Sequence, residues 1–169
     1  MKYNIGIGKQ NFADIRENNY FFVDKTAFIK EWWESGDDVT LITRPRRFGK
    51  TLNMSMLNCF FSNQYADSGH LFRGLKIWED EKYRKIQGTY PVIFISFADV
   101  KSTGFYEARS TIAAIINDVY KQHRYLLDSD ILTDGEKDVW EWLERYVIDS
   151  SMNNDENNSM IQRAIKNLC

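Results

Sequence analysis

The stretch from Val39 to Phe61 reads VTLITRPRRFGKTLNMSMLNCFF and decides the expected fold. Its first five residues, 39–43, are mostly β-branched or apolar, which predicts a short strand. Residues 52–61 carry apolar side chains around most of a helical circumference, which predicts a helix buried inside the fold. Between them stands Gly49-Lys50-Thr51, the closing triplet of the phosphate-binding loop G-x-x-x-x-G-K-[ST]. The order of strand, loop and helix therefore predicts a phosphate-binding loop at residues 44–51.

The chemistry of such a loop assigns a role to each residue type. A glycine lets the backbone approach phosphate oxygens closely, and the first N–H groups of the following helix form a concave anion site. Lys50 would reach the β- and γ-phosphates as the catalytic residue, and the Thr51 hydroxyl would ligate Mg²⁺, which prefers oxygen ligands. We therefore expect ATP with Mg²⁺ as the ligand. The expected nucleotide-binding residues are Arg44, Pro45, Arg46, Arg47, Phe48, Gly49, Lys50 and Thr51.

One position departs from the general loop pattern, and two arginines stand beside it. Arg44 takes the place of the first glycine and Pro45 follows it, which puts the usual first turn in doubt. On the motif alone, a basic surface loop with an incidental Gly-Lys-Thr is the alternative. Arg46 and Arg47 either neutralise phosphate charge or are solvated loop residues that pair with nearby carboxylates.

Helical signals recur along the rest of the chain. Apolar spacing predicts a helix near residues 12–16, another at 28–33 that Asp24 or Thr26 caps and Gly36 ends, and a third at about 105–124. Thr133 and Glu136 have capping-box spacing and begin a fourth helix, whose apolar face is Val139, Trp140, Leu143, Tyr146 and Val147. A linker at 150–159 precedes a last helix from Met160 to Leu168.

The composition of residues 20–23, 39–43 and 91–97 predicts strands. Residues 62–88 are expected to be loop, with short helical pieces near 78–86. Residues 91–97 are almost continuously apolar, as in a strand that is covered on both faces. Strands that alternate with helices indicate an α/β fold with a mostly parallel sheet. Two strong strands are few for such a sheet, so we expect the chain to be part of a larger domain.

Bulk composition narrows the classes of function. The 169 residues carry a net charge of -2, and the pI is about 5.7, whereas a dedicated nucleic-acid binder usually shows a basic excess. Cys59 and Cys169 have no partners at zinc-site spacing. The N-terminus lacks the apolar stretch of a signal peptide, and no apolar run is long enough to span a bilayer. A cytoplasmic protein without a membrane partner is expected, and direct nucleic-acid binding is not.

Three segments together resemble the bacterial AAA-ATPase-like family. The first comprises Ile5-Gly6-Ile7, Phe12, Ile15-Arg16 and the run from Tyr20 to Thr26. The second is the loop from Arg44 to Asn53, and the third is the run from Tyr90 to Phe97. Arginine at position 44 is usual in that family. The resemblance implies a P-loop NTPase of the AAA/STAND kind, with a three-layer αβα fold that is incomplete here. It also implies that residues 1–169 are the N-terminal portion of one nucleotide-binding domain, which stops before the acidic Walker B strand.

The resemblance bears on activity and partners. It implies ATP binding here and ATP hydrolysis only in the full-length protein, because Walker B supplies the carboxylate for magnesium. Asp99 is either an internal substitute for that carboxylate or a residue of a turn. The implied partners are a nucleotide, the missing C-terminal part of the chain and possible further copies in a homo-oligomer. A nucleotide-gated scaffold with little turnover is one alternative, and a nucleic-acid-associated protein that acts through an absent nuclease-like domain is another.

Several residues outside the loop keep two interpretations. Asp24-Lys25-Thr26 either lies near the nucleotide or caps a helix. Phe12 and Tyr20 either pack a purine or belong to the core. His70 and His123 have no partner at catalytic spacing and are expected at a surface or an interface, and Cys59 is expected in the core.

Overall fold

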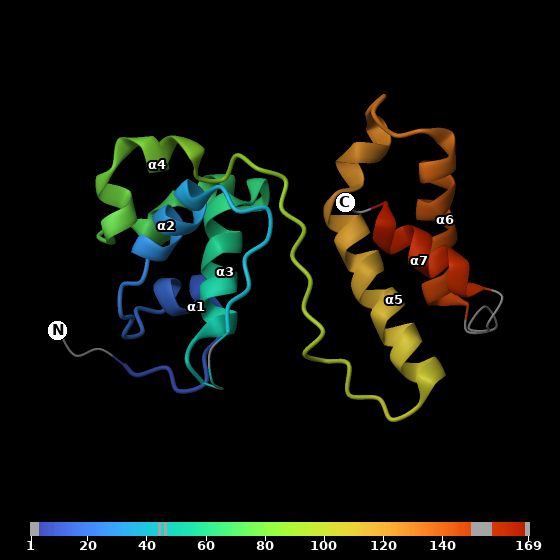
Figure 1. The fold of residues 1–169 in the computed structure, drawn as a ribbon, viewed down its shortest axis with the longest axis horizontal. Coiled ribbons are helices and arrows are strands. Elements are labelled where there is room, and N and C mark those ends of the chain that lie inside the picture. The colour runs from blue at the N-terminus through green and yellow to red at the C-terminus, as the bar shows by residue number, and fades with distance from the viewer. Residues whose placement is uncertain (1–3, 44, 46, 150–156, 168–169) are drawn as a thin grey trace. The chain divides into compact units, whose positions relative to one another are not determined.

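The computed structural model describes residues 4–43, 45, 47–149 and 157–167. The chain forms two compact units, Met1–Val92 and Ile93–Cys169 (Figure 1). Each unit has its own cluster of buried apolar side chains. In the described ranges no helix is long and apolar enough to cross a membrane.

The first unit is helical around a central helix, α3. Its elements are α1 (Phe12–Glu17), α2 (Ala27–Ser35), α3 (Lys50–Phe61), the 3₁₀ segments η1 (Asn63–Phe72) and η2 (Lys76–Glu79), and α4 (Glu81–Ile86). Helix α3 packs against α1 and η1, whereas η2 packs against α2 and α4. Gly36 ends α2 in the left-handed conformation, with a φ of 65°, as the sequence predicted.

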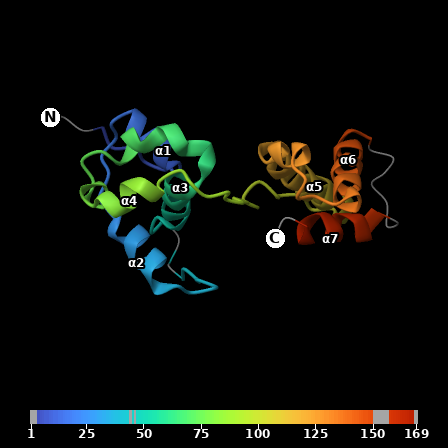
Figure 2. The same cartoon turned by 90° about the horizontal axis from the view of Figure 1, so that it is seen from above.

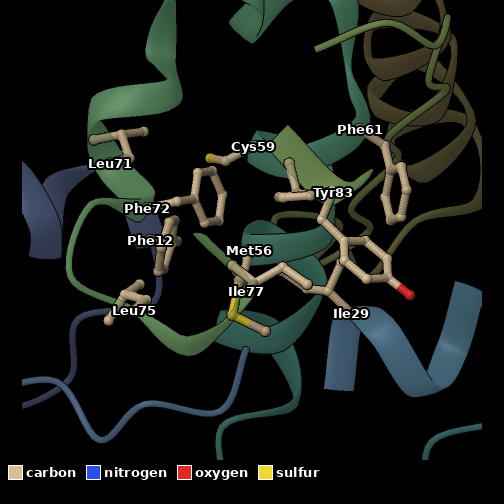
Figure 3. Close-up of a cluster of buried hydrophobic side chains, with 11 residues drawn as sticks. Phe12, Ile29, Met56, Cys59, Phe61, Leu71, Phe72, Leu75, Ile77 and Tyr83 are labelled. Atoms are coloured by element: carbon tan, nitrogen blue, oxygen red, sulfur yellow. The ribbon is translucent and has the colours of Figure 1, made fainter. Parts of the chain in front are cut away.

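Phenylalanine rings form the centre of this unit (Figure 3). Phe12 of α1 stacks on Phe72 of η1 with ring centroids 5.0 Å apart, and Phe60 of α3 meets the same ring edge-on at 5.1 Å. All three side chains are completely buried. Aromatic pairs of this kind add roughly 1 kcal/mol each beyond the burial of their surface. The rings therefore hold α1, α3 and η1 together.

The second unit consists of α5 (Phe105–Gln122), the 3₁₀ turn η3 (Arg124–Asp128), α6 (Asp134–Ile148) and α7 (Asn158–Lys166) (Figure 2). The predicted capping box is confirmed, because Thr133 and Glu136 bond each other's backbone at the start of α6. The Tyr120 hydroxyl donates a hydrogen bond of 2.8 Å to the Ala164 carbonyl, which ties α5 to α7. Burial raises the pKa of Tyr120 to about 12, so this donor keeps its proton at any physiological pH.

The predicted three-layer αβα fold with a mostly parallel sheet is wrong for the described residues, which are largely helical and form no sheet. Residues 39–43 and 91–97 adopt no regular secondary structure there, and Val39 and Leu41 are 86% and 82% exposed. Only isolated bridges form, between Asn4 and Tyr20 and between Ser62 and Tyr90. β-Branched composition sets a local preference, but a strand needs a neighbour that pairs its backbone N–H and C=O groups.

The segment from 62 to 88 is more ordered than its polar composition predicted. It contains η1, η2 and α4, and it supplies Leu71, Phe72, Leu75, Ile77 and Tyr83 to the core. The backbone N–H of Gly88 donates a hydrogen bond of 2.8 Å to the Phe60 carbonyl, which closes this segment onto the end of α3. The sequence did not reveal these apolar positions, because residues in 3₁₀ turns do not repeat with the period of an α-helix.

Two predictions about single side chains had opposite outcomes. Cys59 lies in the core as predicted, and burial raises the pKa of its thiol to about 11, which makes it a poor nucleophile. His123 was expected at a surface or an interface, but it is 5% exposed within the second unit and lies 3.2 Å from the Tyr125 hydroxyl. It ends α5 as the C-cap residue, a position that the spacing of apolar residues did not reveal.

Candidate functional site

The predicted phosphate loop leads into the start of α3. Of its residues the structure describes Pro45 and 47–51, whereas Arg44 and Arg46 lie outside the described residues. Arg47 and Gly49 both have left-handed backbones, with φ of 68° and 76°. Glycine adopts this conformation freely, but at an arginine it costs roughly 1–2 kcal/mol. Strained residues of this kind gather at ligand-binding and catalytic sites.

Helix α3 begins at Lys50 directly after this turn. Gly49 is its N-cap, and no side chain caps this end of the helix. The first bond of the helical turn runs from the Asn53 N–H to the Gly49 carbonyl at 2.9 Å. The N–H groups of a first turn have no carbonyl partner inside their own helix, and they carry partial positive charge. Lys50 and Thr51 are exposed on this turn. The loop is therefore accessible from solvent, and the ligand roles of its residues remain predictions.

Lys25 is an additional cation at this loop. Its Nζ lies 3.7 Å from the point that a Cβ on residue 49 would occupy. The ammonium group forms no ion pair with any carboxylate in the described part of the chain. The sequence analysis singled out Asp24-Lys25-Thr26 but left its role open. In the fold, the Lys25 side chain lies near the loop, while Asp24 and Thr26 form hydrogen bonds to the backbone of η2.

Asp24 and Thr26 attach this turn to the start of η2. One Asp24 oxygen accepts hydrogen bonds from the Thr26 N–H at 2.9 Å and from the Thr26 hydroxyl at 2.6 Å. The other Asp24 oxygen accepts the Lys76 N–H at 2.8 Å, and the Thr26 hydroxyl accepts the Ile77 N–H at 3.2 Å. Thr26 is completely buried. Thr26 is the N-cap residue of α2, as predicted. Its side chain, however, makes no capping hydrogen bond to the helix.

The carboxyl of Asp24 titrates below its ordinary value. Burial alone would raise its pKa, but the hydrogen bonds from Thr26 and Lys76 favour the charged form and lower the pKa overall. A carboxylate that accepts several N–H and O–H groups is stabilised in its ionised state. Asp24 therefore contributes to stability above the pKa of an unfolded aspartate, near pH 4, and that contribution is lost as the pH falls through the lower folded pKa.

We expect Asp24→Asn to lower the unfolding temperature at neutral pH, because an amide accepts these hydrogen bonds less well and brings an N–H₂ group against other donors. Thermal unfolding followed by circular dichroism from pH 7 to pH 3 measures the effect. The difference between wild type and variant should shrink as the pH falls below about 4, because the unfolded carboxyl then takes up a proton and the folded carboxyl follows only at a lower pH. A difference that stays constant with pH would show that the charge of Asp24 is not what stabilises the turn.

The donors at the loop fit magnesium in one respect. Mg²⁺ usually takes few protein ligands and keeps waters and phosphate oxygens around it, so the exposed Thr51 hydroxyl suits it. No group of three His, Cys, Asp or Glu side chains among the described residues is arranged to hold a metal. The Asp99 side chain is 92% exposed in the second unit and lies 3.9 Å from the Lys101 ammonium.

The structure separates the two aromatic residues that the sequence suggested for the base. Phe12 is completely buried among the rings of the first unit, which excludes it from stacking on a purine in this fold. Tyr20 is partly exposed, and the Lys9 ammonium lies 5.2 Å from its ring centroid. The core interpretation of Phe12 is thus confirmed.

Comparisons with known proteins relate this chain to a family. The family described as Predicted AAA-ATPase matches residues 6–167, which cover the loop and both units. An uncharacterized protein in the vnfD 5' region of Azotobacter chroococcum mcd 1 is 40% identical over 92 residues. Those 92 residues are 54% of this chain but 16% of the relative's length. No solved structure matches the chain significantly.

Proposed function

Because the chain belongs to the predicted AAA-ATPase family, we propose that residues 44–51 bind the phosphates of ATP together with Mg²⁺. The main support is the geometry of the loop. A left-handed glycine at position 49 precedes an uncapped helix start, and Lys50 and Thr51 are exposed on the first turn. Such a helix start is one part of what a Gly-Lys-Thr phosphate loop requires, and residues 39–43 before the loop form no strand.

Each part of the loop then has a distinct task. The backbone N–H groups at the start of α3 hold phosphate oxygens, and the partial positive charge of the helix end adds to the attraction. Lys50 brings a full positive charge to the terminal phosphates, and the Thr51 hydroxyl holds the magnesium ion. The ion neutralises phosphate charge when it is bound. We further propose that hydrolysis belongs to the full-length protein, because turnover also needs a carboxylate for magnesium and a group that orients water.

Calorimetric titration with Mg-ATP tests the proposal. Wild type should bind, and Lys50→Ala should weaken binding by about tenfold to a hundredfold, because a hydrogen bond to a charged group contributes roughly 1.5–3 kcal/mol. Lys30→Ala is the matched control, since Lys30 is an exposed lysine on α2 near the ring of Tyr83. Absence of binding to wild type, or equal binding by wild type and Lys50→Ala, would contradict the proposal.

A further inference from the structure

We propose that Lys25 is a second phosphate-binding lysine of this site, supplied from outside the Gly-Lys-Thr loop. The inference rests on the proposed function, because it adds a residue to the same nucleotide site. Lys25 precedes Gly49 by 24 positions in the sequence, yet its Nζ lies 3.7 Å from where a Cβ of residue 49 would stand.

The scaffold determines where the backbone of Lys25 lies. Asp24 and Thr26 attach both sides of the turn to the backbone of Lys76 and Ile77. The Lys25 carbonyl also accepts a hydrogen bond of 3.0 Å from the Phe28 N–H at the start of α2. The backbone of Lys25 is thus held from both directions while its side chain extends to the loop. A side chain that starts from a fixed backbone position has fewer arrangements to lose when it binds a ligand.

The neighbouring carboxylate does not compensate the charge of Lys25. Both oxygens of Asp24 accept hydrogen bonds from Thr26 and Lys76, and no ion pair with Lys25 occurs in the described ranges. The loop itself carries Arg47 and Lys50, and the start of α3 adds partial positive charge. A polyphosphate carries several negative charges, so it is a ligand that cations from two different segments of the chain can bind together.

A purely structural Lys25 would behave differently from a ligand-binding one. The hydrogen bonds of this turn are made by Asp24, by Thr26 and by the backbone. Removal of the Lys25 side chain therefore leaves these bonds in place, and Lys25→Ala should unfold at nearly the same temperature as wild type. Its effect should be on phosphate binding alone.

The experiment compares wild type with Lys25→Ala, Lys25→Arg, Lys50→Ala and the control Lys30→Ala by calorimetric titration. Mg-ATP is one ligand, and tripolyphosphate, which has phosphates but no base or sugar, is the other. We expect Lys25→Ala to weaken binding of both ligands by about tenfold, as for the loss of one charge-assisted contact. Lys25→Arg should recover part of the loss because it keeps the charge. Added salt should weaken wild type more than Lys25→Ala, because salt screens charge interactions.

The outcomes separate the two proposals. If wild type binds Mg-ATP, Lys50→Ala loses binding and Lys25→Ala matches wild type, the role of Lys25 is overturned and the loop proposal stands. If Lys25→Ala loses affinity for Mg-ATP but not for tripolyphosphate, Lys25 contacts the base or sugar, and the phosphate assignment is wrong. If wild type binds neither ligand, both proposals fail. A fall in unfolding temperature that accounts for the lost binding would make Lys25 a structural residue.

Discussion

Gly88→Ala is expected to lower the free energy of unfolding of the first unit by about 3 kcal/mol. Gly88 has a φ of 69°, and a Cβ there would meet the backbone of Ala66, with the Ala66 nitrogen at 2.9 Å and its Cα closer still. The left-handed conformation costs an alanine roughly 1–2 kcal/mol, and overpacking of a close contact adds roughly 1–3 kcal/mol. A small domain has only about 5–15 kcal/mol of stability in total.

Denaturant unfolding followed by circular dichroism measures this loss, and Gly74→Ala is its matched control. Gly74 has a φ of 77°, close to that of Gly88, but a Cβ there would have nothing within 4 Å. The control variant therefore reports only the cost of the left-handed backbone, roughly 1–2 kcal/mol. Equal losses of unfolding free energy in the two variants would mean that Gly88 and Ala66 of η1 do not approach each other as closely as the structure shows.

Phe60→Ala is expected to cost about 3–5 kcal/mol, because it removes a fully buried ring and leaves a cavity. The Phe60 ring meets Phe61 at 5.0 Å and Phe72 at 5.1 Å between centroids, so its loss removes contacts between α3 and η1. The same denaturant titration measures the effect. The near-ultraviolet circular dichroism of the aromatic cluster should weaken in parallel.

Met54→Ala on the same helix is the control for Phe60→Ala. Met54 is 44% exposed, whereas Phe60 is 0% exposed. Surface substitutions usually change stability by less than about 0.5 kcal/mol. The ratio of the two effects thus reports which face of α3 points to the core. If Met54→Ala were as harmful as Phe60→Ala, the orientation of α3 would be wrong.

The candidate site was predictable in part. Gly49, Lys50 and Thr51 are adjacent in the sequence, so the motif that they form can be recognised without knowledge of the fold. The place of Lys25 was not predictable, because its approach to Gly49 depends on how the turn at 24–26 attaches to η2. The only signal in the sequence was that Asp24-Lys25-Thr26 belonged to the family resemblance. The resemblance did not distinguish the three residues from one another. In the structure, Asp24 and Thr26 form hydrogen bonds to the start of η2, whereas Lys25 lies near Gly49.

The sequence by itself determined the positions of most helices. The Thr133–Glu136 capping box, the end of α2 at Gly36 and the apolar faces of α5 to α7 all depend on residues a few positions apart, and such interactions form wherever the helix lies. Only the tertiary structure decided that residues 39–43 and 91–97 have no strand partner in the described ranges, and that Lys25 lies at Gly49. Both depend on contacts between distant segments, because a strand is stable only beside a neighbour and a charge acts only on the groups that folding brings near it.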